Sequence, residues 1–174
     1  VGAGPGAEDL ITVRGQKYLQ EADQIIYAGS LVNPALLNRK KETAIVKNSA
    51  YMTLEEVIQA ICKEEEKGGL TVRLHTGDPC LYGAIREQMD ELDARGISYE
   101  VCPGVSSFSG AAAALQAEYT LPSISQSVVI TRMAGRTPVP ERESIRAFAA
   151  HGATMVIFLS AGMLPKLQEE LLLG

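Results

Sequence analysis

A short apolar run followed by a glycine-containing loop is the feature that most constrains the fold. Residues 70–74 read Leu-Thr-Val-Arg-Leu, which has the length and β-branched content of a buried strand. The loop over residues 75–83 follows, and then comes a helix with one apolar face, formed by Leu81, Ile85, Met89 and Leu92. This order is typical of an α/β sheet, which binds its ligands beyond the carboxyl ends of its strands.

The loop itself carries residues suited to a binding site. Gly77 lets a ligand approach the backbone, and Pro79 stiffens the turn. Asp78 adds a carboxylate that suits a cationic or hydroxyl-bearing ligand. An ordinary strand-to-helix turn, with Asp78 as a cap, explains the same residues about equally well.

The rest of the chain alternates between strand and helix patterns, which predicts an α/β protein with two α/β domains. We expect the further strands over 24–28, 44–46, 98–101, 127–131 and 153–159. Asp9 is expected to cap the first helix, and Thr53 with Glu56 to form a capping box. The predicted domains are residues 1–118 and 127–174, joined by a linker over 119–126. The second stretch has too few strands for a full sheet, so we expect it to be only the start of a domain that is truncated or disordered beyond Gly174.

Composition excludes several classes of protein. The formal net charge is −5 and no basic cluster is present, which argues against a nucleic-acid partner. The apolar runs are far shorter than the roughly 18 residues that span a bilayer. The three cysteines and two histidines lack metal-site spacing, so no metal is expected, and the cysteines suit a reducing cytoplasm.

Two further segments leave alternatives open. The start, Gly2-Ala3-Gly4-Pro5-Gly6, lacks the G-x-G-x-x-G spacing of dinucleotide-binding folds. A nicotinamide-dependent oxidoreductase is therefore disfavoured, although Asp23 stands where such folds need an acidic residue. Ser106 and Ser107 either cap the helix that follows them or offer hydroxyl groups to a ligand.

Five segments together are more specific than any of these motifs alone. They are residues 1–12 with Gly4-Pro5-Gly6, 27–32, 76–83, 103–114 and 154–159. On these segments the chain resembles the tetrapyrrole (corrin/porphyrin) methylases, which use S-adenosylmethionine in cobalamin and sirohaem synthesis. Residues 27–34, 81–88 and 131–140 are most similar to the members that methylate C-11 of precorrin-4 or cobalt-precorrin-4.

The resemblance implies a homodimer in which the cofactor lies in a cleft between two α/β domains, with S-adenosylhomocysteine as product. A cytoplasmic location is expected from the cysteines. The cofactor contacts that it implies are Pro5, Thr76, Gly77, Asp78, Leu81, Ser106, Ser107 and Leu159. Relatives often carry methionine at the position of Leu159, so a backbone contact is expected there. The glycine loop at the start is expected to face the tetrapyrrole.

The chemistry that the resemblance implies adds roles for individual residues. A carboxylate beside the sulfonium would stabilise the ground state more than the transition state, so Asp78 is expected to bind the ribose or amino-acid end of the cofactor. The corrinoid substrate is a polycarboxylate, which Arg132 and Arg136 are expected to bind, unless they form interdomain ion pairs. Tyr27 and Tyr82 are further substrate-binding candidates.

The resemblance leaves some questions open. No residue stands out as a general base, although Tyr27, Tyr82 and His75 are candidates. A non-catalytic tetrapyrrole carrier, and a sister methylase acting on another ring carbon or another substrate, remain alternatives. The sequence does not decide whether the substrate already carries cobalt.

Overall fold

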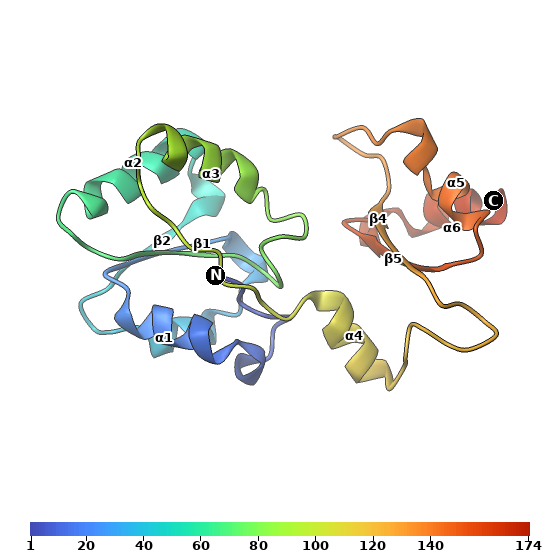
Figure 1. The fold of residues 1–174 in the computed structure, drawn as a ribbon, viewed down its shortest axis with the longest axis horizontal. Coiled ribbons are helices and arrows are strands. Elements are labelled where there is room, and N and C mark those ends of the chain that lie inside the picture. Colours follow the sequence, from blue (N-terminus) through green and yellow to red (C-terminus); the bar gives the residue numbers. More distant parts are fainter. The chain divides into compact units, whose positions relative to one another are not determined.

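The computed structural model describes the backbone of residues 1–174 and every side chain except that of Ser30. The chain forms two compact units, Val1–Ala111 and Ala112–Gly174 (Figure 1). Both units combine parallel strands with helices, as the sequence predicted. The domain boundary proposed from sequence, after residue 118, stays a prediction.

The first unit is built on a parallel sheet in the order β2-β1-β3. Its strands are β1 (Gln24–Tyr27), β2 (Ile45–Asn48) and β3 (Thr71–Leu74). The start of the chain continues this sheet, because Gly2 forms a parallel bridge with His75 and its N–H donates to the Cys102 carbonyl at 3.0 Å. The strand expected over 98–101 is not formed, since the neighbouring segment pairs only at Cys102, just beyond it.

The helices of the first unit are α1 (Val13–Glu21), which precedes β1, α2 (Leu54–Glu65), which follows β2, and α3 (Ile85–Ala94), which follows β3. The boundary between the units falls within α4 (Ser107–Leu115). Short 3₁₀ turns cover Glu8–Leu10, Gly29–Leu31, Pro34–Arg39 and Ser49–Tyr51. The capping box of Thr53 and Glu56 is confirmed. The prediction for Asp9 is wrong: it lies in a 3₁₀ turn, and Thr12 caps α1 by accepting from the Gly15 N–H at 3.0 Å.

Helices cover both faces of the sheet, and the alternation of strand side chains explains why. Ile25 belongs to one core cluster, with Leu19 of α1. Its neighbour Ile26 belongs to the other, with Ile58 of α2 and Leu92 of α3. Figure 1 shows α1 on one side of the strands and α2 with α3 on the other. Each fully buried side chain of this kind contributes about 1.5–3 kcal/mol.

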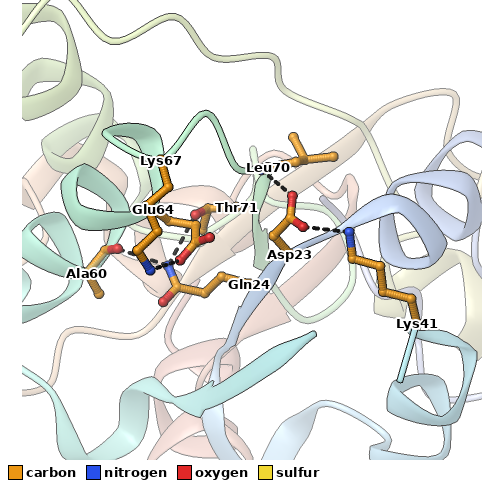
Figure 2. Close-up of polar contacts among 8 residues, drawn as sticks. All are labelled: Asp23, Gln24, Lys41, Ala60, Glu64, Lys67, Leu70 and Thr71. Atoms are coloured by element: carbon orange, nitrogen blue, oxygen red, sulfur yellow. Dashed lines mark hydrogen bonds and ion pairs between the residues drawn. The ribbon is translucent and has the colours of Figure 1, made fainter. Parts of the chain in front are cut away.

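A polar network fixes the amino ends of the central strands (Figure 2). Asp23 accepts from Lys41 Nζ at 2.6 Å and from the Leu70 N–H at 2.8 Å, and the bond with Lys41 is the main cause of the lowered pKa of this carboxyl. Gln24, which is buried, donates to the Ala60 carbonyl and to Thr71 Oγ1. The carboxyl ends of the same strands lie at the opposite edge.

The second unit has a two-stranded parallel sheet. It contains β4 (Val128–Arg132), β5 (Thr154–Phe158), α5 (Ile145–Ala149) and α6 (Leu164–Leu172), with 3₁₀ turns over Glu141–Glu143 and Ala161–Met163. Residues 119–126, the predicted linker, are anchored to β5: Thr154 Oγ1 donates to the Tyr119 carbonyl at 2.8 Å, and its N–H donates to Ser125 Oγ at 3.0 Å. Among the helices described, none is both long and apolar enough to cross a membrane.

Candidate cofactor site

Three loops meet at the carboxyl edge of the first sheet: residues 2–6, 75–82 and 102–107. Gly4 and Gly77 form an antiparallel bridge in which the Gly77 N–H donates to the Gly4 carbonyl at 2.9 Å and the Gly4 N–H donates to the Gly77 carbonyl at 3.2 Å. The first loop therefore pairs with the second.

The loops touch through backbone, which only glycine allows. A Cβ on Gly2 would lie 2.5 Å from Gly104 Cα and 2.6 Å from the Gly77 carbonyl oxygen. Gly77 also has φ +59°, a conformation that side-chain-bearing residues seldom adopt. Gly77 was singled out from sequence for the approach of a ligand. The structure shows that Gly2 and Gly104 are needed for the loops to pack on one another, whereas Gly77 is needed for its backbone conformation.

Asp78 joins the second loop to the third. Its Oδ1 accepts from the Cys80 N–H at 2.7 Å, and its Oδ2 accepts from the Gly104 N–H at 3.0 Å. The alternative in which Asp78 caps the following helix is not observed, because α3 begins only at Ile85.

The other residues predicted to contact a cofactor from this unit lie in the same loops. Pro5, Thr76 and Leu81 are half-buried, Ser106 is buried and Ser107 is exposed. The Ser106 carbonyl accepts from the Ser109 and Gly110 N–H groups, so Ser106 stands at the start of α4. The first loop packs on this helix: a Cβ on Gly110 would lie 2.7 Å from Pro5 Cβ.

The segment that leads into α3 has unusual backbone conformations. Tyr82 has φ +57° and Ala84 has φ +49°, both in the left-handed region. A Cβ on Gly83, between them, would lie 3.0 Å from Pro79 Cα. Left-handed residues other than glycine cost on the order of 1–3 kcal/mol each and cluster at functional sites. Sequence reasoning found Tyr82 as a candidate but had no signal for this strain.

In the second unit, Leu159 follows β5 with φ +57° and a 70% exposed side chain. Ser160 beside it is buried; its hydroxyl accepts from the Met133 N–H at 3.1 Å and donates to the Phe158 carbonyl at 2.8 Å. Ser160 therefore links the ends of β4 and β5 and fixes the backbone next to Leu159. The sequence analysis did not identify Ser160.

Comparison with known proteins assigns this arrangement to a family. The family model described as Tetrapyrrole (Corrin/Porphyrin) Methylases matches residues 1–173. The chain belongs to this family. The resemblance proposed from sequence is thereby confirmed.

Several tetrapyrrole methylases are close relatives of the chain. It is 55% identical to a cobalt-precorrin-4 C(11)-methyltransferase of Methanocaldococcus jannaschii, over 100% of this chain and 67% of that protein. It is 45% identical to a precorrin-4 C(11)-methyltransferase of Pseudomonas aeruginosa, over 99% of this chain and 68% of that protein. The chain thus spans about two thirds of the length of the curated relatives it matches.

Solved structures of tetrapyrrole methylases confirm the predicted fold. The X-ray structure of a cobalt precorrin-4 methyltransferase matches with a TM-score of 0.96 and 46% identity, over 99% of this chain and 72% of that chain. A uroporphyrin-III C-methyltransferase of Thermus thermophilus, solved with S-adenosylhomocysteine, matches with a TM-score of 0.76 at 24% identity and supports the fold alone.

The two arginines predicted to bind substrate differ in their surroundings. Arg132 donates from its guanidinium to the carbonyls of Met133, Thr137 and Pro138, at 3.4, 3.0 and 2.9 Å. It therefore organises its own loop. Arg136 is exposed. Among the side chains described, neither arginine forms an ion pair within its own unit. The alternative of interdomain ion pairs stays a prediction.

The general-base candidates also differ. His75 is buried, and burial, with a smaller effect of Arg73, lowers its pKa to about 3. The imidazole is therefore neutral at pH 7 and accepts protons only weakly. Tyr27 is half-buried and packs against a core cluster at the end of β1, while Tyr82 is 43% exposed. The described residues contain no group of His, Cys, Asp and Glu side chains placed to hold a metal ion.

The position of Asp23 bears on the nicotinamide alternative. A dinucleotide-binding fold needs its acidic residue at the carboxyl edge, next to the ribose. Asp23 instead precedes β1 at the amino edge, where Lys41 and the Leu70 N–H occupy its carboxylate (Figure 2). The structure therefore gives this alternative no support.

Proposed function

We propose that the protein transfers a methyl group from S-adenosylmethionine to C-11 of precorrin-4 or cobalt-precorrin-4 in cobalamin synthesis. The observation that carries the proposal is the match to precorrin-4 methyltransferases over essentially the whole chain, at 55% identity with one relative and a TM-score of 0.96 with a solved one. A homodimer remains a prediction from the family resemblance, and a cytoplasmic location remains a prediction from the cysteines.

The loops at the carboxyl edge fit an adenosyl ligand. They offer an exposed hydroxyl at Ser107, half-buried apolar side chains at Pro5 and Leu81, and glycine backbone at Gly77, which has no Cβ to obstruct a ligand. Together with Thr76, Asp78 and Ser106, these are our proposed contacts in the first unit. Leu159 is proposed as a backbone contact from the second unit.

Methyl transfer from S-adenosylmethionine requires these side chains mainly to position the ligands. When bound, S-adenosylmethionine supplies an already activated methyl group, whose bond to sulfur breaks with the electron pair left on sulfur. The residues of the chain need only hold the ligands in near-attack geometry, which lowers a barrier by up to roughly 7–11 kcal/mol. The strained backbone at Tyr82 and Ala84 is consistent with a site held rigidly in one conformation.

A polycarboxylate substrate requires local positive charge in a protein of net charge −5. Arg136 is the better candidate for this role, because Arg132 already donates to three carbonyls of its own loop. We propose that Arg136 binds a substrate carboxylate and that Arg132 shapes the loop that presents it. Tyr27 and Tyr82 are retained as further substrate contacts.

A sister methylase acting on another ring carbon is the second candidate. The chain is 34% identical to a uroporphyrinogen-III C-methyltransferase of Priestia megaterium, over 99% of its length. The cobalt-precorrin-4 C(11)-methyltransferase of the same organism is 48% identical, over 98% of the chain. This difference within one organism favours C-11 of precorrin-4.

Calorimetric titration with S-adenosylmethionine, S-adenosylhomocysteine and NAD tests the cofactor assignment. We expect both sulfur ligands to bind and NAD to give no heat of binding. Binding of NAD alone would refute the assignment.

A further inference from the structure

Asp78 connects two loops through opposite oxygens of one carboxylate. The bond to the Cys80 N–H lies within its own loop, whereas the bond to the Gly104 N–H spans 26 residues of sequence. Hydrogen bonds to an ionised acceptor are about twice as strong as neutral ones. The carboxylate therefore connects the loop after β3 directly to the loop before α4.

This connection joins two loops that contain residues proposed to bind the cofactor. Asp78 belongs to the proposed cofactor loop with Thr76 and Gly77, and Gly104 lies two residues before Ser106, which immediately precedes α4. Gly104 packs on the backbone of Gly2 and Gly77. The third loop is also held two residues earlier, where the Gly2 N–H donates to the Cys102 carbonyl at 3.0 Å. Without the bond from Asp78, the loop that positions Ser106 and Ser107 loses a charge-assisted connection to the second loop.

We propose that the Asp78 carboxylate has a positioning role: it supports cofactor binding by joining these two loops, and the contact of Asp78 with the cofactor is left to its backbone. The inference rests on the proposed function, because it takes the loops to be the cofactor site. It differs from the expectation drawn from the sequence, in which the carboxylate itself binds the ribose or amino-acid end.

Two substitutions distinguish the effect of the hydrogen bond to the Gly104 N–H from that of the hydrogen bond to the Cys80 N–H. In Asp78→Asn one oxygen remains, and asparagine readily keeps the local turn that accepts from the Cys80 N–H. Its amide N–H₂ group then faces the Gly104 N–H, so only the bond between the loops is lost. Asp78→Ala removes both bonds. Asp90→Asn is the matched control, since this exposed carboxylate on α3 pairs with Arg86 and its loss changes the net charge equally.

The test combines amide hydrogen exchange of the ligand-free protein with calorimetric titration of S-adenosylhomocysteine. A lost hydrogen bond to a charged group corresponds to roughly a 10–100-fold change. We expect Asp78→Asn to accelerate exchange of the Gly104 amide at least about 10-fold while the Cys80 amide stays protected, and to weaken S-adenosylhomocysteine binding. Asp78→Ala should accelerate both amides, and Asp90→Asn should change neither exchange nor affinity.

Each other result overturns the inference. Weaker ligand binding with unchanged Gly104 exchange would show that the carboxylate contacts the ligand directly. Faster exchange with unchanged affinity would show that the connection does not serve the site. If the unsubstituted protein bound no S-adenosylhomocysteine, the proposed function would fail. The exchange measurement would still show whether Asp78 connects the two loops. Should Asp78→Ala not fold, Asp78→Asn carries the test.

Discussion

Replacing Gly104 by alanine should destabilise the protein, because the added Cβ would strike backbone from two other loops. The Cβ would lie 2.7 Å from Gly2 Cα and 3.0 Å from the Gly2 carbonyl carbon, and nearer still to the Gly77 carbonyl oxygen. None of these atoms is the end of a flexible side chain that could move away. Overpacking against atoms that cannot yield costs about 1–3 kcal/mol.

Urea unfolding measures this cost. With a slope of about 1–3 kcal/mol per molar, a loss of this size lowers the unfolding midpoint by roughly 1 M. Gly162→Ala is the matched control: its Cβ would meet no atom within 4 Å, and its backbone does not require glycine. We expect that control to stay within about 0.5 kcal/mol of the unsubstituted protein. Equal midpoints for Gly104→Ala and Gly162→Ala would show that the loops do not pack as described.

Three further outcomes follow from the same contacts. Ser160→Ala should cost about 1–3 kcal/mol of unfolding free energy, since it leaves a backbone N–H next to β4 without its acceptor; an unchanged urea midpoint would contradict this. The pKa of His75, about 3, lies below the usual value of 6.5, so stability should fall as pH drops from about 6.5 toward 3. His75→Asn should reduce this loss of stability at low pH, and a substitution of the exposed His151 should not; equal profiles of stability against pH for the two variants would refute the role of His75. Arg136→Ala should raise the substrate KM with unchanged stability, whereas Arg132→Ala should lower the melting temperature; the reverse pattern would reject these roles.

The elements that local sequence determines were predicted well. The strand over 70–74 and the capping box at Thr53 depend on neighbouring residues, and both are present. The first helix cap was assigned to Asp9 instead of Thr12, because both residue types can cap and only the geometry of the preceding 3₁₀ turn separates them.

The contacts that build the site are mostly between distant residues, and the sequence did not reveal them. The bond from the Gly104 N–H to Asp78 depends on how two loops meet at the sheet edge. The hydrogen bonds from Arg132 to the Thr137 and Pro138 carbonyls depend on how the loop after β4 is folded. The left-handed backbone at Tyr82 and Ala84 has no sequence signal, since neither residue is glycine.

Product analysis with alternative tetrapyrroles tests the central claim most directly. The protein would be incubated with methyl-labelled S-adenosylmethionine and, separately, with precorrin-4, cobalt-precorrin-4 and uroporphyrinogen III, and the labelled carbon located by NMR. We predict label at C-11 of one of the two precorrin-4 forms and none on uroporphyrinogen III. Label on uroporphyrinogen III alone, or at another carbon of precorrin-4, would contradict the account.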